Sequence, residues 1–531
     1  MLPNQRGVVR RALVVLLASF VLIAVVYRKT PMNFLRSESG WFLFHAYSAS
    51  VVQQHFLHGF FTGSYGGHYT PLAFLGEFEM AKIAGTNESI WKWRQIIVLA
   101  FIAAGVAGTV HSIGGAFQLA PSRRWLMAAA LAAGSIYRPE MMDFVSWPFM
   151  ILQLLFIGLL MLVLYAVLCV ATDPDLKRWP WIAALAAAGS LHVSGMGMCA
   201  VAAVAVVFSG ILLIASRSPA TNYYAPRRRI ASALITMLCL AVAHGWAMLH
   251  FLPAVQSSAP VSSGSFLKLI LGFTANLAIT ALRTFVGTTI PEPDARALAY
   301  SWPYGLLVIA GAVFLLRWLL RKSFREPTPE NVTRFALHTF SIGGFFALIA
   351  LIAIRQFQSS SMDASATAMA VFAAVPRYLV PLHFLALGSA ADLAVRLARR
   401  SPRFSSGLFC ALAVAAFVAQ VDYRWSTFPQ VATYARISHS SAWGLIVATA
   451  RECRAAQLPI PNIPLATLTQ EFFDWDPKMF EPLLRRELNL GPDDSIEMIT
   501  WEQYRGENRD RYRKSVPSLQ LLEEKLYLKE D

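Results

Sequence analysis

Residues 148–171 read PFMILQLLFIGLLMLVLYAVLCVA, an uninterrupted run without a single charged residue. A helix of about 20 apolar residues crosses the ~30 Å hydrocarbon layer of a bilayer. Similar runs recur along the 531-residue chain, in which 56% of residues are hydrophobic and 15% are charged. A soluble domain carries about 25% charged residues. The sequence therefore predicts an all-α, polytopic transmembrane helical bundle.

The distribution of basic residues gives the expected orientation. The net charge is +15, and most Lys and Arg lie in short loops between the apolar runs. Basic residues in such loops mark the cytoplasmic side, so this excess does not indicate a nucleic-acid partner. Arg6, Arg10 and Arg11 place the N-terminus in the cytoplasm, before an uncleaved first span. We expect an integral protein of the bacterial inner (plasma) membrane.

About eleven crossings satisfy this charge rule. They are expected at 12–27, 95–119, 124–137, 148–171, 178–190, 194–216, 230–252, 302–320, 335–354, 378–395 and 404–421. Residues 266–290 are apolar enough to cross, but then the basic loop 317–334 would lie outside. We therefore expect a re-entrant or interfacial helix there, with a crossing as the open alternative.

This assignment predicts two domains. Residues 1–424 form the transmembrane domain, with long external loops at about 28–93 and 253–301. Residues 425–531 form a small extracytoplasmic helical tail. Helix signals in the tail lie at 440–457, 476–488 and 516–528.

The first external loop is chemically dense. Glu38 lies near its start, and the turn Gly67-His68-Tyr69-Thr70-Pro71-Leu72 follows later. Thr70 and Pro71 are typical of a helix start, with Thr as the N-cap and Pro at the first helical position. Gly85 is a natural stop for that helix, and a surface helix is expected over 39–57.

Other polar residues lie at the expected external ends of spans. Arg138, Glu140 and Asp143 occupy the second external loop, within Arg138-Pro139-Glu140-Met141-Met142-Asp143. His192 ends the fifth span, and Arg377-Tyr378 precede Pro381 in a late one. Acidic residues are scarce inside the spans, which disfavours an ion-coupled transporter.

In this order, the motifs resemble those of GT-C type membrane glycosyltransferases, the superfamily of protein O-mannosyltransferases and lipid A aminoarabinose transferases. The similarity in layout covers roughly residues 1–421. It implies transfer of a sugar from a polyprenyl-phosphate donor to an extracytoplasmic acceptor, with inversion of the anomeric centre. The acceptor is a glycan, a lipid or a protein.

The resemblance also implies roles for residues. Glu38 is the expected general base, because an acceptor hydroxyl has a very high pKa. Glu140 or Asp143 would be a second acidic contact. Cationic and polar groups would hold the leaving lipid phosphate. These substrate-binding candidates are His68, Tyr69, Arg138, His192, Arg377 and Tyr378.

Alternatives to this hypothesis remain. A single carboxylate in the first loop is a poor site for a divalent cation, so we assign no metal ligands. A divalent cation nevertheless remains a possible cofactor, and it is the one cofactor that the sequence leaves open. Arg138 and Arg377 lie at membrane boundaries, where Arg reaches lipid headgroups in any case. A lipid-linked saccharide flippase without catalysis is the main alternative function. A polysaccharide polymerase or ligase of unrelated fold is a weaker one.

Overall fold

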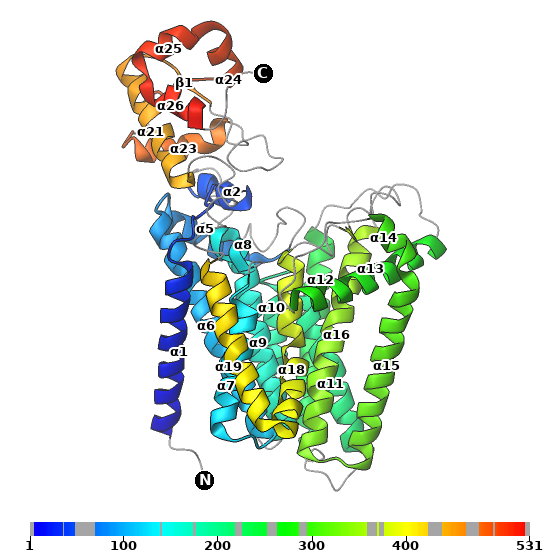
Figure 1. The fold of residues 1–531 in the computed structure, drawn as a ribbon. Coiled ribbons are helices and arrows are strands. Elements are labelled where there is room, and N and C mark those ends of the chain that lie inside the picture. Colours follow the sequence, from blue (N-terminus) through cyan, green and yellow to red (C-terminus); the bar gives the residue numbers. More distant parts are fainter. Residues whose placement is uncertain are drawn as a thin grey trace.

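A computed structural model gives the fold in Figure 1. It describes residues 5–35, 37–47, 69–138, 141–173, 177–217, 226–251, 263–285, 295–357, 369–370, 376–422, 438–462, 477–491 and 494–525. The described chain is almost entirely helical, which confirms the predicted all-α bundle. A separate small unit follows the bundle, at the end away from the start of the first helix.

Long helices run antiparallel to one another through the bundle. They are α1 (Gln5–Tyr27), α6 (Glu88–Ala116), α7 (Pro121–Ile136), α9 (Ile151–Thr172), α10 (Trp179–Leu191), α11 (Gly197–Arg217), α12 (Arg227–Phe251), α15 (Trp302–Arg325), α16 (Pro329–Phe357), α18 (Pro376–Arg400) and α19 (Pro402–Asp422). Within the described ranges, nine helices are long and apolar enough to cross a membrane. The structure thus supports a membrane protein, but its helix lengths do not fix the number of crossings at eleven.

The helices divide into inner and outer ones. More than two thirds of the apolar window of α18 is buried, against 11% for α15 and 17% for α19. Inner helices approach closely where a glycine faces a large neighbour. A Cβ built on Gly210 of α11 would lie 2.2 Å from the Phe335 ring of α16. Small residues at such crossings let apolar helices pack tightly in a bilayer.

Helix α13 (Ser263–Phe285) has the length and composition of a span, yet Figure 1 shows it running across one end of the bundle. It packs against the short α14 (Ala295–Tyr300) and the start of α15. Asn276 Nδ2 donates to Ser301 Oγ at 2.7 Å, and a Cβ on Gly305 would lie 2.0 Å from the Leu271 carbonyl oxygen. This placement fits the interfacial or re-entrant helix expected within 266–290.

Buried charges join helices at the end opposite the tail. Asp392 of α18 is fully buried and accepts hydrogen bonds from Arg334 Nε and His338 Nε2 of α16, each at 3.1 Å. Arg396 Nη2 lies 2.6 Å from the same carboxylate. One turn further, Arg399 donates to the Phe117 carbonyl at 2.7 Å. The cluster therefore fastens α6, α16 and α18 together.

The tail contains the three predicted helices, as α21 (His439–Ala455), α23 (Pro477–Glu487) and α26 (Pro517–Lys525). It is not purely helical, however. Strands β1 (Ile460–Pro461) and β2 (Met498–Ile499) pair in parallel. They were not predicted because two-residue strands have no detectable alternation of apolar and polar residues. The remaining elements are α24 (Trp501–Gln503), η3 (Tyr504–Asn508) and α25 (Arg509–Ser515).

Candidate functional site

Four short elements gather at the end of the bundle nearest the tail. They are α2 (Ser37–His45), α5 (Pro71–Ala84), α8 (Met141–Ser146) and η1 (Pro148–Met150). Figure 1 shows α2, α5 and α8 between the long helices and the tail. The two segments expected to carry acidic residues, α2 with Glu38 and α8 with Asp143, are therefore brought together.

Hydrogen bonds join α2 to η1, the short helix that follows α8, and join the chain before α2 to the last residue of α8. The Phe149 amide donates to Ser39 Oγ at 2.9 Å, and the Asn33 amide donates to the Ser146 carbonyl at 2.7 Å. Ser39 is the neighbour of Glu38, so this contact fixes the backbone that carries the expected base. The Phe42 ring also lies 6.1 Å from the Phe149 ring, in a stacked arrangement.

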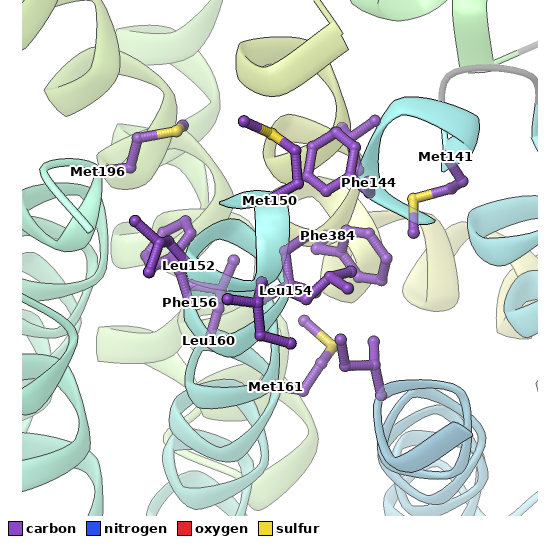
Figure 2. Close-up of a cluster of buried hydrophobic side chains, with 14 of the residues drawn as sticks. Met141, Phe144, Met150, Leu152, Leu154, Phe156, Leu160, Met161, Met196 and Phe384 are labelled. Atoms are coloured by element: carbon purple, nitrogen blue, oxygen red, sulfur yellow. The ribbon is translucent and has the colours of Figure 1, made fainter. Parts of the chain in front are cut away.

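Helix α8 is held by its apolar residues. Figure 2 draws Met141 and Phe144 of α8 in one cluster of buried side chains with Phe384 of α18. Both α8 residues are at most 1% exposed. With these side chains anchored in the core, the backbone at Asp143 stays at the edge of the bundle.

A buried ion pair between α5 and α6 supports the same group of short helices. Glu77 of α5 is 2% exposed and forms a salt bridge with Arg94 Nη1 of α6. Arg94 Nη2 also donates to the Pro148 carbonyl at 2.7 Å. Burial raises the pKa of the Glu77 carboxyl above its ordinary value, and the Arg94 guanidinium opposes that shift. The neighbouring Gln95 amide donates to the Phe144 carbonyl at 3.0 Å, so α6 holds α5, α8 and η1 in place.

A second group of polar side chains surrounds the start of α5. The Tyr69 ring lies 5.3 Å from the His244 ring of α12, which in turn lies 4.7 Å from the His192 ring. The His192 carbonyl accepts from the Ala73 amide at 3.4 Å, so the loop after α10 contacts the first turn of α5. Two predicted substrate-binding residues, Tyr69 and His192, thus lie in one cluster, although they are far apart in sequence.

This cluster has unused hydrogen-bonding capacity. Within the described part of the chain, Nδ1 of His192, Nδ1 of His244 and Thr70 Oγ1 are buried and have no hydrogen-bond partner. Burial lowers the pKa of the His192 imidazole, which favours its neutral form. A neutral imidazole can donate from one nitrogen and accept at the other. The cluster can therefore offer donors to an anion without carrying a permanent charge.

The expected boundaries of α5 are confirmed, but Thr70 does not play the expected capping role. The helix begins at Pro71 and Gly85 follows its last residue, with φ +51°. The Thr70 side chain makes no capping hydrogen bond. Its hydroxyl is free to bind another group beside the N-terminal amides, where a helix attracts anions.

Arg138 is only 5% exposed at the outer end of α7. Its carbonyl accepts from Gln420 Nε2 of α19 at 2.8 Å. Its side chain lies in the neighbourhood of the buried His383 of α18. The sequence placed Arg138 at a membrane boundary, and the structure places it among packed helices.

For several predicted site residues, the structure does not describe the side chain. His68 and Glu140 lie outside the described residues. The backbones at Glu38, Asp143, Arg377 and Tyr378 are described, in α2, α8 and α18, but their side chains are not. The surface helix expected over 39–57 begins at Ser37 and continues to His45, and 48–68 also lie outside the described residues.

Sequence reasoning missed His244 and the Glu77–Arg94 pair. His244 lies inside an apolar run whose other polar residues gave no pattern. Glu77 and Glu79 are two residues apart, which places them on different faces of a helix and argues against a catalytic pair. The sequence does not show that Arg94 is the partner of Glu77, because Arg94 belongs to the next helix.

Among the residues described, no three His, Cys, Asp or Glu side chains gather closely enough to hold a metal ion. The five cysteines are all free thiols.

Comparison with known proteins gives no independent guide to the function. No family model, no curated protein and no solved structure matches the chain.

Proposed function

We propose that this protein is a membrane glycosyltransferase that moves a sugar from a polyprenyl-phosphate donor to an extracytoplasmic acceptor. The observation that carries the proposal is the meeting of α2 and η1 through Ser39 and Phe149, 2.9 Å apart. It joins the segments of Glu38 and Asp143 beside a polar cluster. The acceptor hydroxyl attacks the anomeric carbon, Glu38 takes its proton, and the lipid phosphate departs with the bonding electrons.

The polar cluster at the start of α5 supports a site for the donor phosphate. Thr70, His192 and His244 converge beside a helix N-terminus and retain unpartnered buried atoms. A phosphodiester needs several hydrogen-bond donors and a favourable field, and a helix N-terminus supplies both. Arg138, which follows α7 at the same end of the bundle, would add positive charge.

An apolar groove on α12 supports a site for the lipid chain. It is lined by Leu238, Cys239, Val242, Ala243 and Trp246. His244 lies on the packed face of α12 and the groove on its outer face. The groove and the polar cluster approach each other at the C-terminal end of α12. There the centres of the Trp246 and His250 rings lie 5.4 Å apart, and those of the Phe251 and Tyr69 rings lie 5.8 Å apart. An isoprenoid chain lying in the groove would bring its phosphate to the cluster.

The same proposal places eleven helices across the membrane. It takes α13 as an external interfacial helix and puts the tail on the extracytoplasmic side. Under this arrangement every basic loop is cytoplasmic, as the positive-inside rule requires. Helices α1, α7 and α10, which are not among the nine helices of the described chain that are long and apolar enough to cross alone, then cross as part of the packed bundle.

The decisive experiment replaces the expected base. Glu38→Gln keeps the size of the side chain but removes proton acceptance, so transfer should fall by about 100- to 10 000-fold. Purified protein in proteoliposomes would be given a panel of tritium-labelled polyprenyl-phosphate sugars with membrane extract as acceptor. The matched control is Glu79→Gln, because Glu79 is an exposed acid of the same loop paired with Lys82.

The alternative outcomes are distinct. Transfer that persists at the wild-type rate in Glu38→Gln refutes the assignment of the base. Movement of the labelled lipid across the bilayer without sugar transfer would instead favour the flippase.

A further inference from the structure

The segment that carries Glu38 is supported from outside the membrane bundle. Helix α2 packs against α5, η1 and α23 of the tail. Its apolar residues Phe42, Leu43 and Phe44 are at most 1% exposed. A helix of nine residues cannot hold its position alone, because isolated helices shorter than ~12–15 residues are marginal in water. Its packing partners therefore determine where it lies.

The tail contributes a specific contact to this segment. The Leu35 amide donates to Nδ1 of His439 at 3.1 Å. Leu35 and His439 are both buried, and the His439 ring also lies edge-on to the Phe34 ring at 6.0 Å. Because Nδ1 accepts a backbone N–H, that nitrogen carries no proton. One side chain of the tail thus fixes the backbone three residues before Glu38.

Neighbouring contacts reinforce the attachment. The Phe44 ring of α2 lies 6.2 Å from the Trp443 ring of α21. Arg486 of α23 donates to the Tyr47 hydroxyl, and its guanidinium lies 4.6 Å from the centre of the Tyr47 ring. These contacts lie before α2, near its C-terminal end and just after it, so the tail holds the chain at both ends of the helix.

Leu35 lies directly against the first turns of α2. A Cβ on Gly40 would lie 2.6 Å from the Leu35 carbonyl oxygen. Leu35 and Gly40 are therefore in direct backbone contact across the turn that contains Glu38. A shift of Leu35 must be transmitted to α2, because the backbone atoms already touch.

We propose that the C-terminal tail is a structural half of the catalytic site, with His439 as the positioning residue that fixes the Glu38 segment through Leu35. This inference rests on the proposed function for its catalytic consequence. Its structural part, that His439 holds α2, is independent of that function.

The test uses the full-length protein in nanodiscs and two measurements. His439→Ala should raise the amide exchange rate at Leu35 and along α2 by about 5- to 10-fold, as expected for one lost hydrogen bond. It should lower kcat for transfer by about 100-fold with donor KM nearly unchanged, because a small misplacement of a reacting group is costly while donor binding is untouched. His439→Asn should restore both, since its Oδ1 can accept from the Leu35 amide.

Thr86→Val is the matched control. It removes the 2.9 Å hydrogen bond from Thr86 to Glu487, which also joins the tail to the bundle but lies outside α2. Wild-type exchange in α2 and wild-type kcat are expected for this variant.

The results separate the two claims. Wild-type exchange at Leu35 and α2 in His439→Ala would overturn the proposal. So would faster exchange with unchanged kcat, or a kcat that His439→Asn fails to restore. If the wild-type protein transfers no sugar, the proposed function is wrong, and the exchange rates still decide whether the tail holds α2.

Discussion

The Glu77–Arg94 pair offers a quantitative test of how the site is supported. Glu77→Gln removes the negative charge that faces the mostly buried Arg94 guanidinium, whose other contacts are the Pro148 carbonyl and the Trp91 ring. Two unit charges about 3 Å apart interact by about 5–6 kcal/mol at an effective dielectric constant near 20. Removing one member of a buried pair costs about 3–5 kcal/mol. We expect a loss of unfolding free energy in that range.

A double-mutant cycle isolates the pair. Glu77→Leu and Arg94→Met should each destabilise strongly, and the double variant should be less destabilised than their sum by about 2 kcal/mol or more. Reversible unfolding in mixed micelles, followed by tryptophan fluorescence, measures each free energy. Glu79→Gln is the control, since Glu79 forms an exposed pair with Lys82 worth at most about 0.5 kcal/mol.

The pH dependence has a definite sign. The folded-state pKa of Glu77 lies above its ordinary value of 4.5. The buried carboxyl is favoured in its protonated form. The stability that this preference contributes is therefore fully present below pH 4.5 and is lost as pH rises through the raised pKa. The coupling to Arg94 behaves oppositely, because it needs the ionised carboxylate, and it weakens as pH falls. A coupling below about 0.5 kcal/mol at pH 8 would refute the reasoning.

Further predictions concern other parts of the molecule. Burial lowers the pKa of His192, so the wild type should lose more stability than His192→Asn as pH falls below 6.5, measured by thermal melts. Gly210→Ala should lower the free energy of unfolding by about 1–3 kcal/mol, because the new Cβ would overpack against the facing ring of α16. Gly134→Ala is the control and should not destabilise the protein, because a Cβ there meets nothing within 4 Å. Cys239 in the groove should be protected from a lipophilic maleimide by polyprenyl phosphate, and Cys410, equally exposed on α19, should not. Equal labelling of both would argue against a lipid chain in the groove.

Much of the fold follows from local sequence. Apolar runs predict the long helices, and Pro71 and Gly85 predict both ends of α5, because these signals act within a few residues. The start of α6 is different. It begins at Glu88, seven residues before the expected span, because Asn87 caps it outside the apolar run through a hydrogen bond from the Ser89 amide.

The candidate site is less predictable, because its contacts join distant segments. Glu38, Tyr69 and His192 were selected by type and position, and the structure brings their backbones to one end of the bundle. The partners His244 and His439 were not selected, since nothing near them in sequence shows what they contact. Their roles depend on tertiary packing alone.

The charge cluster around Asp392 has a consequence for how substrates reach the protein. Alternating access requires each side of a transporter to part in turn. On the side remote from the tail, Arg334 and His338 of α16 contact the buried Asp392 carboxylate of α18, which Arg396 of α18 also contacts. Parting α16 from α18 there would separate Arg334 and His338 from the buried Asp392 carboxylate, at a cost of several kcal/mol each cycle. A membrane protein that binds its substrates only from the side nearest the tail never has to open this end. The ion pairs around Asp392 can then keep it permanently closed.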